Sequence, residues 1–348
     1  MTMPISADRL FAFSSNALFR AGLEKPAADR VAELMTQADL QGSDGHGIIR
    51  LVPYVKRIHA GGINIRPEIR IVTERSAMAL LDGDNGMGHL VMDRAARMAI
   101  EKARTTGIAW VGTRQSNHAG PASLYARMAM EQDMIGVYFA VGNANHLPPW
   151  GGIEMLLSTN PIAVAIPARH EPPIVLDMAT TVAAYGKVKA KAQKGETMPE
   201  GWMIDREGKP LTDPKRAGEG FLMPIGGYKG YGLALIVGLL AGTLNGAAMG
   251  KEVIDFNVDQ NTPTNTGQAI MAIDISAFGD VSAFKQRVDV LIRDMRNSPR
   301  MPDVERIWLP GEQSHERRIA YARDGVPLAP ALLKNLQALA EELNIEPL

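Results

Sequence analysis

The order of the predicted secondary structure constrains the fold of this chain more than any other feature of its sequence. Between residues 108 and 178, four short β-rich runs (IAWV, IGVYFAV, IAVAI and IVLDM) are interrupted by one good helical stretch, at 122–132. A doubly wound fold alternates strands and helices throughout. Since this segment does not alternate, it predicts an α/β (α+β) fold with a mixed or largely antiparallel sheet.

Helical patterns dominate both ends of the chain. Apolar residues recur with the helical period from about residue 10 to residue 58, and again at 281–295 and 332–343. Helical ends around a β-rich centre predict that the two termini pack together as one discontinuous domain. We place this helical domain at residues 1–76 with 282–348, and a central domain at 77–281.

Two segments follow the β-rich region. Residues 196–223 are rich in turn residues and predict a long functional or capping loop. Residues 231–249 form an uncharged stretch whose length is close to that of a membrane-spanning helix. Their four glycines favour a buried core helix instead. Gly238, Gly242 and Gly246 recur every four residues and predict one stripe of close packing against a sheet or helix, with a subunit interface as the alternative.

Composition excludes several classes of function. Lys and Arg total 37 against 38 Asp and Glu, so nucleic acid is not expected as the main partner. The absence of cysteine excludes disulfides, iron–sulfur clusters and a thiol nucleophile, and it is typical of the reducing cytoplasm, where we expect the protein to reside. The early charges Asp8 and Arg9 argue against a signal peptide. The seven histidines lack the spacing of metal ligands, so no metal site is predicted.

The first candidate site is the run GSDGHGIIRL at residues 42–51. Two glycines flank His46, and its imidazole is suited to exchange a proton with a substrate hydroxyl or carbonyl at neutral pH. Asp44 is a candidate to orient that ring, and the Arg50 guanidinium offers a fork for a carboxylate. A turn whose histidine only bonds the backbone is the alternative, which the neighbouring glycines and Arg50 make weaker.

Two more candidate sites lie at predicted helix starts. SNHAG, at 116–120, follows a strand, and backbone amides at such junctions bind anions. His118 is therefore a candidate to contact substrate or nicotinamide, although a turn that only caps the helix explains the motif equally well. GGYKGYG, at 226–232, surrounds Lys229 with glycines and predicts a cradle for a phosphate or carboxylate. It lacks the ending of a nucleotide-hydrolysing P-loop, so phosphoryl transfer is not indicated.

Taken together, the motifs of this chain resemble the malate/L-lactate/ureidoglycolate dehydrogenase family of NAD(P)-dependent oxidoreductases, which is unrelated to the Rossmann-type lactate and malate dehydrogenases. The resemblance covers nearly the whole chain. It rests on eight motifs in this order: ADLQGSDGHGIIRLVPYVKRI, LDGDNGMGHLV, SNHAG, STNPIAVAIP, LDMATTVAAYGKV, PEGWMIDREGKPLTDP, GGYKGYGLAL and LPGE. It implies a helical domain from both termini, a central non-Rossmann NAD(P)-binding domain with a mainly antiparallel sheet, and a homodimer with active sites near the subunit interface.

The resemblance also implies roles for individual residues. His46 would be the proton donor or acceptor, Arg50 would hold the substrate carboxylate, and His118 would lie at the nicotinamide, where some members use it as the catalytic base. Further substrate contacts are implied for Tyr54 and Thr159, and a catalytic role for Lys187. The implied cofactor contacts are His118, Gly120, Asp177, Met178, Ala179, Lys229, Gly230, Pro310, Gly311 and Glu312.

The sequence thus predicts an enzyme that transfers a hydride between NAD or NADP, with NAD preferred, and a small 2-hydroxy acid or its 2-oxo acid. One alternative is NAD(P)H-dependent reduction of a cyclic imine such as a piperideine or pyrroline-2-carboxylate. In those family members a serine before the histidine belongs to its relay, and Gly45 has no hydroxyl to take that part. The second alternative is a non-catalytic cofactor-binding protein, against which the intact His46, Arg50 and His118 argue.

Overall fold

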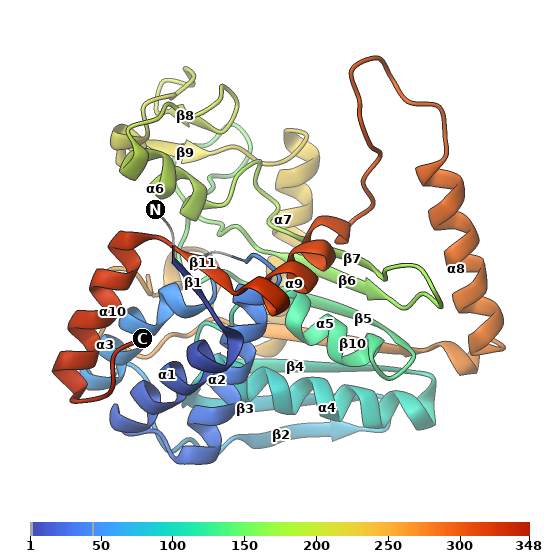
Figure 1. The fold of residues 1–348 in the computed structure, drawn as a ribbon, viewed down its shortest axis with the longest axis horizontal. Helices are drawn as coiled ribbons and strands as arrows, with labels where there is room; N and C mark the ends of the chain where they lie inside the picture. Colours follow the sequence, from blue (N-terminus) through green and yellow to red (C-terminus); the bar gives the residue numbers. More distant parts are fainter. Residues whose placement is uncertain (1–2, 44) are drawn as a thin grey trace.

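The computed structural model describes residues 3–43 and 45–348. Asp44, the predicted orienting group for His46, therefore lies outside the described residues. A seven-stranded sheet forms the centre of the molecule, and helices of the two chain ends, apart from the one at 281–296, gather at one side of it (Figure 1). This arrangement confirms the predicted α/β (α+β) class.

The sheet is mixed and mainly antiparallel, as predicted. Only β3 and β4 pair in parallel; each of the other neighbouring pairs is antiparallel. Because β10 lies between β4 and β5, the centre of the sheet joins segments far apart in sequence. From edge to edge the strands are β2 (Arg70–Arg75), β3 (Met78–Gly86), β4 (Ile108–Ser116), β10 (Gln268–Asp274), β5 (Met134–Ala140), β6 (Ile162–Ile166) and β7 (Ile174–Met178).

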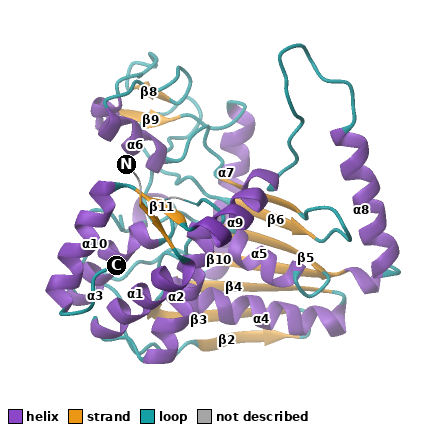
Figure 2. Cartoon of the chain, in the orientation of Figure 1, coloured by secondary structure: helices purple, strands orange, loops and turns teal. Residues whose placement is uncertain are grey.

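Two helices cover one face of the sheet, α4 (Gly88–Thr106) and α5 (Ser123–Met130) (Figure 2). Their small side chains allow a close approach, since Ala95, Ala99 and Ala126 are fully buried in one hydrophobic cluster with the sheet. The predicted helix at 122–132 corresponds to α5.

The chain ends form a second hydrophobic cluster, so the two termini pack together; the division of the chain into a helical and a central domain stays a prediction. Buried residues near the N-terminus, such as Leu18 and Tyr54, pack in this cluster with C-terminal residues such as Leu336. A short strand pair also ties the ends together: β1 (Met3–Ile5) is antiparallel to β11 (Val326–Leu328). The helices of this cluster are α1 (Ala7–Arg20), α2 (Lys25–Leu40), α3 (Leu51–His59) and α10 (Pro330–Leu343). The exact domain boundaries remain a prediction.

Helix α8 (Val281–Arg296) stands apart from this cluster. In Figure 1, α8 and the loop after it project at the far side of the sheet before the chain returns through α9 (Glu312–Asp324). The Asp289 carboxylate accepts hydrogen bonds from the backbone amides of 169–171, between β6 and β7. Helix α8 is therefore attached to the end of the β6–β7 hairpin.

The glycine-rich helix is shorter than predicted. Helix α7 (Tyr228–Ala241) ends before Gly242, and Gly246 lies in a later turn, so the expectation of one three-glycine stripe was wrong. Gly238 does face a neighbour, because a Cβ there would lie 2.9 Å from the amide of Asn160. In the part of the chain that the structure describes, no helix is long and apolar enough to cross a membrane.

The prediction of a long loop at 196–223 was also wrong. This segment contains β8 (Met203–Asp205), a 3-10 helix (Pro214–Glu219) and β9 (Gly220–Leu222). With α6 (Tyr185–Lys194) it forms a small unit whose apolar residues, scattered among the turns, bury one another. These are Val188, Met198, Met203, Leu211, Ala217 and Leu222.

Candidate active site

Four predicted site residues meet in one histidine cluster: His46, Arg50, Tyr54 and His118. Arg50 ends a 3-10 helix that continues into α3, so Arg50 and Tyr54, four residues apart, project from one side of the helical segment. The rings of His46 and His118 stack with centroids 5.3 Å apart. The Tyr54 hydroxyl lies 2.6 Å from Nδ1 of His118. Residues separated by 72 positions in sequence are thus brought together.

The loop that carries His46 is fixed from behind by Asp39. The Asp39 carboxylate accepts a hydrogen bond from the Ile48 amide at 2.8 Å. A Cβ on Gly47 would lie 1.8 Å from the same carboxylate, so no other residue fits this position without a shift. Within the loop, Nε of Arg50 donates to the Gly45 carbonyl at 2.7 Å. These contacts fix the part of the loop from which His46 and Arg50 extend into the histidine cluster.

Sequence reasoning missed Phe256, which closes the cluster. Its ring centroid is 5.9 Å from that of His118 and 6.3 Å from that of Tyr54. The guanidinium of Arg57, only 1% exposed, lies over the Phe256 ring at 4.8 Å and donates to the backbone carbonyls of Asp259 and Thr262. Arg57 therefore holds the loop that carries Phe256. A local pattern cannot reveal a contact across about 200 residues.

Electrostatics keep both histidines of the cluster neutral. Burial, and then the charge of Arg50, lower the pKa of His46 to about 4. The same two causes hold the pKa of His118 well below its ordinary value. Burial raises the pKa of Tyr54, so that its hydroxyl stays protonated at neutral pH. At rest, the site therefore offers two neutral imidazoles and one guanidinium.

A third histidine, His89, lies directly behind Tyr54. It is fully buried, its ring meets that of Tyr54 edge-on at 5.6 Å, and neither ring nitrogen has a hydrogen-bond partner among the residues that the structure describes. Burial, with smaller contributions from His46 and Arg30, lowers the pKa of His89 to about 3. In sequence it reads only as the start of an amphipathic helix.

We expect His89→Leu to stabilise the protein by about 1–3 kcal/mol, because it removes buried polar atoms that lack partners. It should also reduce acid sensitivity. The unfolded chain binds a proton at an ordinary histidine pKa, whereas folded His89 does not until about pH 3, so wild-type stability falls as the pH drops from about 6.5. Urea unfolding at neutral and mildly acidic pH measures both effects, with exposed His170→Leu as the control. A less stable variant would contradict the expectation.

The remaining predicted residues gather where strands β6 and β7 meet the start of α7. The Thr159 carbonyl accepts hydrogen bonds from the amide and hydroxyl of Thr180, both at 2.9 Å. Thr180 directly follows Asp177, Met178 and Ala179. Its carbonyl accepts from the Ile225 amide at 3.0 Å, three residues before α7, which carries Lys229 and Gly230. The turn Pro310–Glu312 lies along β7, where the Pro310 carbonyl accepts from the Val175 amide at 3.0 Å.

Hydrogen bonds connect this strand-end group to the histidine cluster. The Asp177 carboxylate accepts from the Ser123 amide at 2.9 Å. The amide of Gln41 lies 3.2 Å from the hydroxyls of both Ser123 and Ser43, and the Ser43 carbonyl accepts from the His46 amide. Gln41 thereby joins the loop of His46 to the end of β7, a link that the sequence analysis did not anticipate.

The side chains of two predicted site residues, Lys187 and Glu312, do not join the others. Lys187 is exposed on α6, and among the described residues no contact joins it to the histidines, so its catalytic role remains a prediction. The carboxylate of Glu312 is buried and paired with Arg296 of α8 at 2.5 Å. Its side chain therefore fixes the return of the chain from α8 to α9.

The start of α7 fits the anionic part of a dinucleotide cofactor. Gly226 and Gly227 have positive φ angles of 57° and 65°, and no side chain of the described residues caps the helix. Its first amides, together with the exposed Lys229, form the type of cationic helix end that binds a diphosphate.

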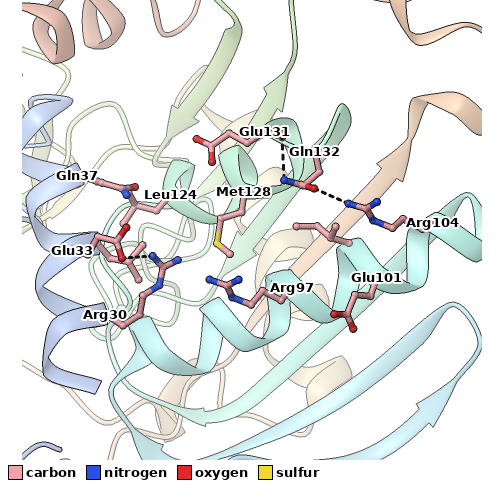
Figure 3. A pocket seen from close by; sticks show the side chains of 12 residues that line it. Arg30, Glu33, Gln37, Arg97, Glu101, Arg104, Leu124, Met128, Glu131 and Gln132 are labelled. Carbon is pink, nitrogen blue, oxygen red and sulfur yellow. Dashed lines mark hydrogen bonds and ion pairs between the residues drawn. The ribbon is translucent and has the colours of Figure 1, made fainter. Parts of the chain in front are cut away.

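Two cavities lie among the elements described above. One of about 370 Å³ adjoins the Phe256 loop and is lined by His146, Tyr185, Lys189 and Asp255, among others; this volume suits a small ligand. The other, of about 530 Å³, lies between α2, α4 and α5 (Figure 3). Its charged side chains largely pair with each other or with neighbours, as Arg30 does with Glu33 at 2.6 Å. Neither cavity is lined by a residue of the histidine cluster; the first reaches the neighbours of Phe256 in sequence, Asp255 and Asn257.

A mixed, mainly antiparallel sheet and a histidine–arginine cluster are the fold and the site of an oxidoreductase outside the Rossmann class. The chain belongs to the malate/L-lactate dehydrogenase family, whose sequence model matches residues 5–337. It is 39% identical to a malate dehydrogenase of Pyrococcus horikoshii, over 98% of this chain and 96% of the relative. It is 37% identical to an L-sulfolactate dehydrogenase of Methanothermobacter thermautotrophicus, over 99% and 98% respectively. A ureidoglycolate dehydrogenase (NAD(+)) of Escherichia coli O157:H7 is 31% identical, over 96% and 95%.

Solved structures agree with this assignment. A malate dehydrogenase structure from Pyrococcus horikoshii matches with a TM-score of 0.91 and 36% identity, over 100% of this chain and 97% of that chain. A delta1-piperideine-2-carboxylate reductase from Pseudomonas syringae matches with a TM-score of 0.86 and 29% identity, over 97% and 100%. The resemblance identified from the eight motifs is thereby confirmed.

Proposed function

We propose that this dehydrogenase interconverts a small 2-hydroxy acid and its 2-oxo acid with NAD. The observation that carries the proposal is the histidine cluster, in which one guanidinium and two neutral imidazoles share a half-buried site. A 2-hydroxy acid presents a carboxylate for the guanidinium and a hydroxyl for an imidazole. The names of the relatives, which include malate, sulfolactate and ureidoglycolate dehydrogenases, support this substrate class.

In the proposed mechanism, Arg50 binds the substrate carboxylate and orients C2. During oxidation, the neutral His46 accepts the hydroxyl proton as the hydride leaves C2, and a C=O double bond forms. When bound, the nicotinamide ring supplies the hydride acceptor. The substrate carboxylate offsets the charge of Arg50, which is one of the two causes that lower the pKa of His46. Substrate binding therefore makes His46 a stronger proton acceptor.

We propose that Lys229, Gly230, Gly120 and the segment Asp177–Ala179 hold the cofactor, with Pro310–Glu312 beside them. The proposed preference for NAD is supported by the relative named as a ureidoglycolate dehydrogenase (NAD(+)).

Reduction of a cyclic imine is the second candidate function, supported by the similarity to the piperideine-carboxylate reductase. Gly45 argues against it. A Cβ at this position would have no neighbour within 4 Å, so the site has room for a serine, yet the chain supplies no hydroxyl there.

The decisive experiment compares substrates. Purified protein is mixed with NADH or NADPH and a panel of 2-oxo acids and cyclic imines, and the loss of reduced-cofactor absorbance is followed. We expect turnover of at least one 2-oxo acid, faster with NADH than with NADPH, and no comparable turnover of imines. Faster turnover of an imine would favour the second function, and cofactor binding without any turnover would favour a non-catalytic protein.

We further propose a cytoplasmic homodimer that forms through α7. The small residues of this helix face the protein, whereas Tyr228, Ile236 and Leu239 are 63%, 53% and 41% exposed. Apart from Lys229 at its start, this exposed helix face carries no charge, which is typical of a subunit interface, and two copies can bury it against each other. Because α7 begins at the cofactor-binding end, the interface would adjoin the active site.

Ile236→Glu combined with Leu239→Glu is expected to convert the dimer to a monomer, since each charge would be buried in the interface without a partner. Sedimentation velocity measures the change, and Val290→Glu on the exposed face of α8 is the matched control. A wild-type protein that sediments as a monomer at micromolar concentration would refute the proposal.

A further inference from the structure

The different roles of His46 and His118 in proton transfer follow from the hydrogen bonds at one nitrogen atom of His118. Nδ1 of His118 lies 2.6 Å from the Tyr54 hydroxyl and also accepts a hydrogen bond from the backbone amide of Gly120 at 3.3 Å. A backbone N–H can only donate, so Nδ1 must carry a lone pair and no proton. The Tyr54 hydroxyl must then donate as well.

The remaining proton of the neutral imidazole is therefore on Nε2. Because Tyr54 is fully buried, its hydroxyl retains its proton and stays a donor. His118 itself is half-buried, and its ring stacks on that of His46. Among the described residues, no hydrogen bond reaches Nε2 on the edge away from Tyr54, and Nε2 is not a buried atom, so it is free to meet a substrate. In this tautomer, Nε2 donates a hydrogen bond and has no lone pair with which to accept a proton.

We propose that Tyr54 and the Gly120 amide lock His118 in the Nε2–H tautomer, so that His118 donates a hydrogen bond to the substrate oxygen and His46 alone exchanges the proton. This inference rests on the proposed function and deepens it by dividing the two roles. Tyr54 is then a positioning residue, which acts through His118.

This division of roles between His46 and His118 accounts for each bond that forms or breaks in the reaction. In the direction of reduction, a hydride adds to C2 of the 2-oxo acid and breaks the π bond of the carbonyl. The oxygen takes that electron pair and is stabilised by the Nε2–H of His118, as in an oxyanion hole. His46, whose proton affinity rises when the substrate carboxylate offsets the charge of Arg50, takes up a proton from solvent and passes it to this oxygen, which forms the O–H bond of the product. In oxidation, the same proton returns to His46, and His118 keeps its own proton throughout.

The tautomer is measurable without any assay of activity. Histidine labelled with ¹⁵N distinguishes a protonated from an unprotonated ring nitrogen in long-range ¹H–¹⁵N spectra, and comparison with His118→Gln assigns the signal. We expect unprotonated Nδ1 and protonated Nε2 in the wild-type protein at neutral pH. In Tyr54→Phe we expect the Nδ1 signal to shift and the Nδ1–H form to gain population. A wild-type His118 with protonated Nδ1 would overturn the proposal.

Kinetics test the division of roles with matched variants. The side-chain amide of glutamine places an N–H donor near the position of Nε2, so His118→Gln should retain kcat within about tenfold, whereas His118→Ala should lose about 100- to 1,000-fold. His46→Gln should lose at least about 1,000-fold, because an amide cannot exchange the proton. Equal losses in His118→Gln and His118→Ala, with smaller losses in His46→Gln, would overturn the assignment. If wild-type protein turns over no 2-oxo acid, the proposed function fails, while the spectra still decide the tautomer.

Discussion

Replacing Arg50 with glutamine is expected to lower kcat/KM for 2-oxo acids by about a thousandfold. Loss of a charged partner from a half-buried carboxylate site costs about 4 kcal/mol, which corresponds to this factor. Among residues 3–43 and 45–348, no carboxylate forms an ion pair with Arg50, and its Nε donates only to the Gly45 carbonyl. The rest of the guanidinium makes no hydrogen bond with these residues, and it is the part that we propose binds the substrate carboxylate.

The same variant provides a second measurement. Removing the charge of Arg50 removes one cause of the low pKa of His46, so this imidazole should titrate above its wild-type pKa of about 4. Steady-state kinetics and a histidine NMR titration follow the two effects, with Arg70→Gln on the exposed strand β2 as the control. Unchanged kcat/KM in Arg50→Gln would remove this residue from substrate binding.

Replacing Arg57 with alanine is expected to destabilise the protein by about 3–5 kcal/mol. The buried guanidinium bonds two backbone carbonyls, and hydrogen bonds from a charged group contribute about 1.5–3 kcal/mol each. The loop from Asp255 to Thr262 would lose its anchor, and Phe256 would no longer close the site beside His118. We therefore expect KM for the acid to rise together with the loss of stability.

Urea unfolding and kinetics measure these effects in Arg57→Ala. Arg206→Ala is the matched control, because the Arg206 guanidinium also lies over a phenylalanine ring, that of Phe221 at 5.9 Å, but is exposed. Its loss should cost less than about 1 kcal/mol. If Arg57→Ala lowered stability without any change in KM, Arg57 would matter for folding alone, and the role of its loop at the site would be refuted.

Local sequence patterns predicted most elements of the fold, because helical periods and β-rich runs depend on neighbours a few residues apart. The helices predicted at 122–132 and 332–343 are examples. Patterns failed at 196–223, where apolar residues are too scattered to show a period, although they form their own small core. They failed also for α7, whose uniformly apolar sequence continues past its end at Ala241.

The site residues also differ in whether a local sequence pattern or only a distant contact reveals them. His46 and Arg50 stand out because glycine-flanked histidines and a nearby arginine are unusual within one short run. His89, Arg57 and Phe256 look like ordinary helix and loop residues, and only their contacts with distant segments give them a role. A histidine without partners for its nitrogens is visible only once its surroundings are known.

The position of β10 has a consequence for synthesis of the protein. Strands β4 and β5 have no hydrogen bonds with each other, because residues 268–274 fill the space between them. A chain still emerging from the ribosome therefore carries two unsatisfied sheet edges until its last quarter has been translated. The native core can close only afterwards, so nascent chains depend on protection from edge-to-edge aggregation during this interval.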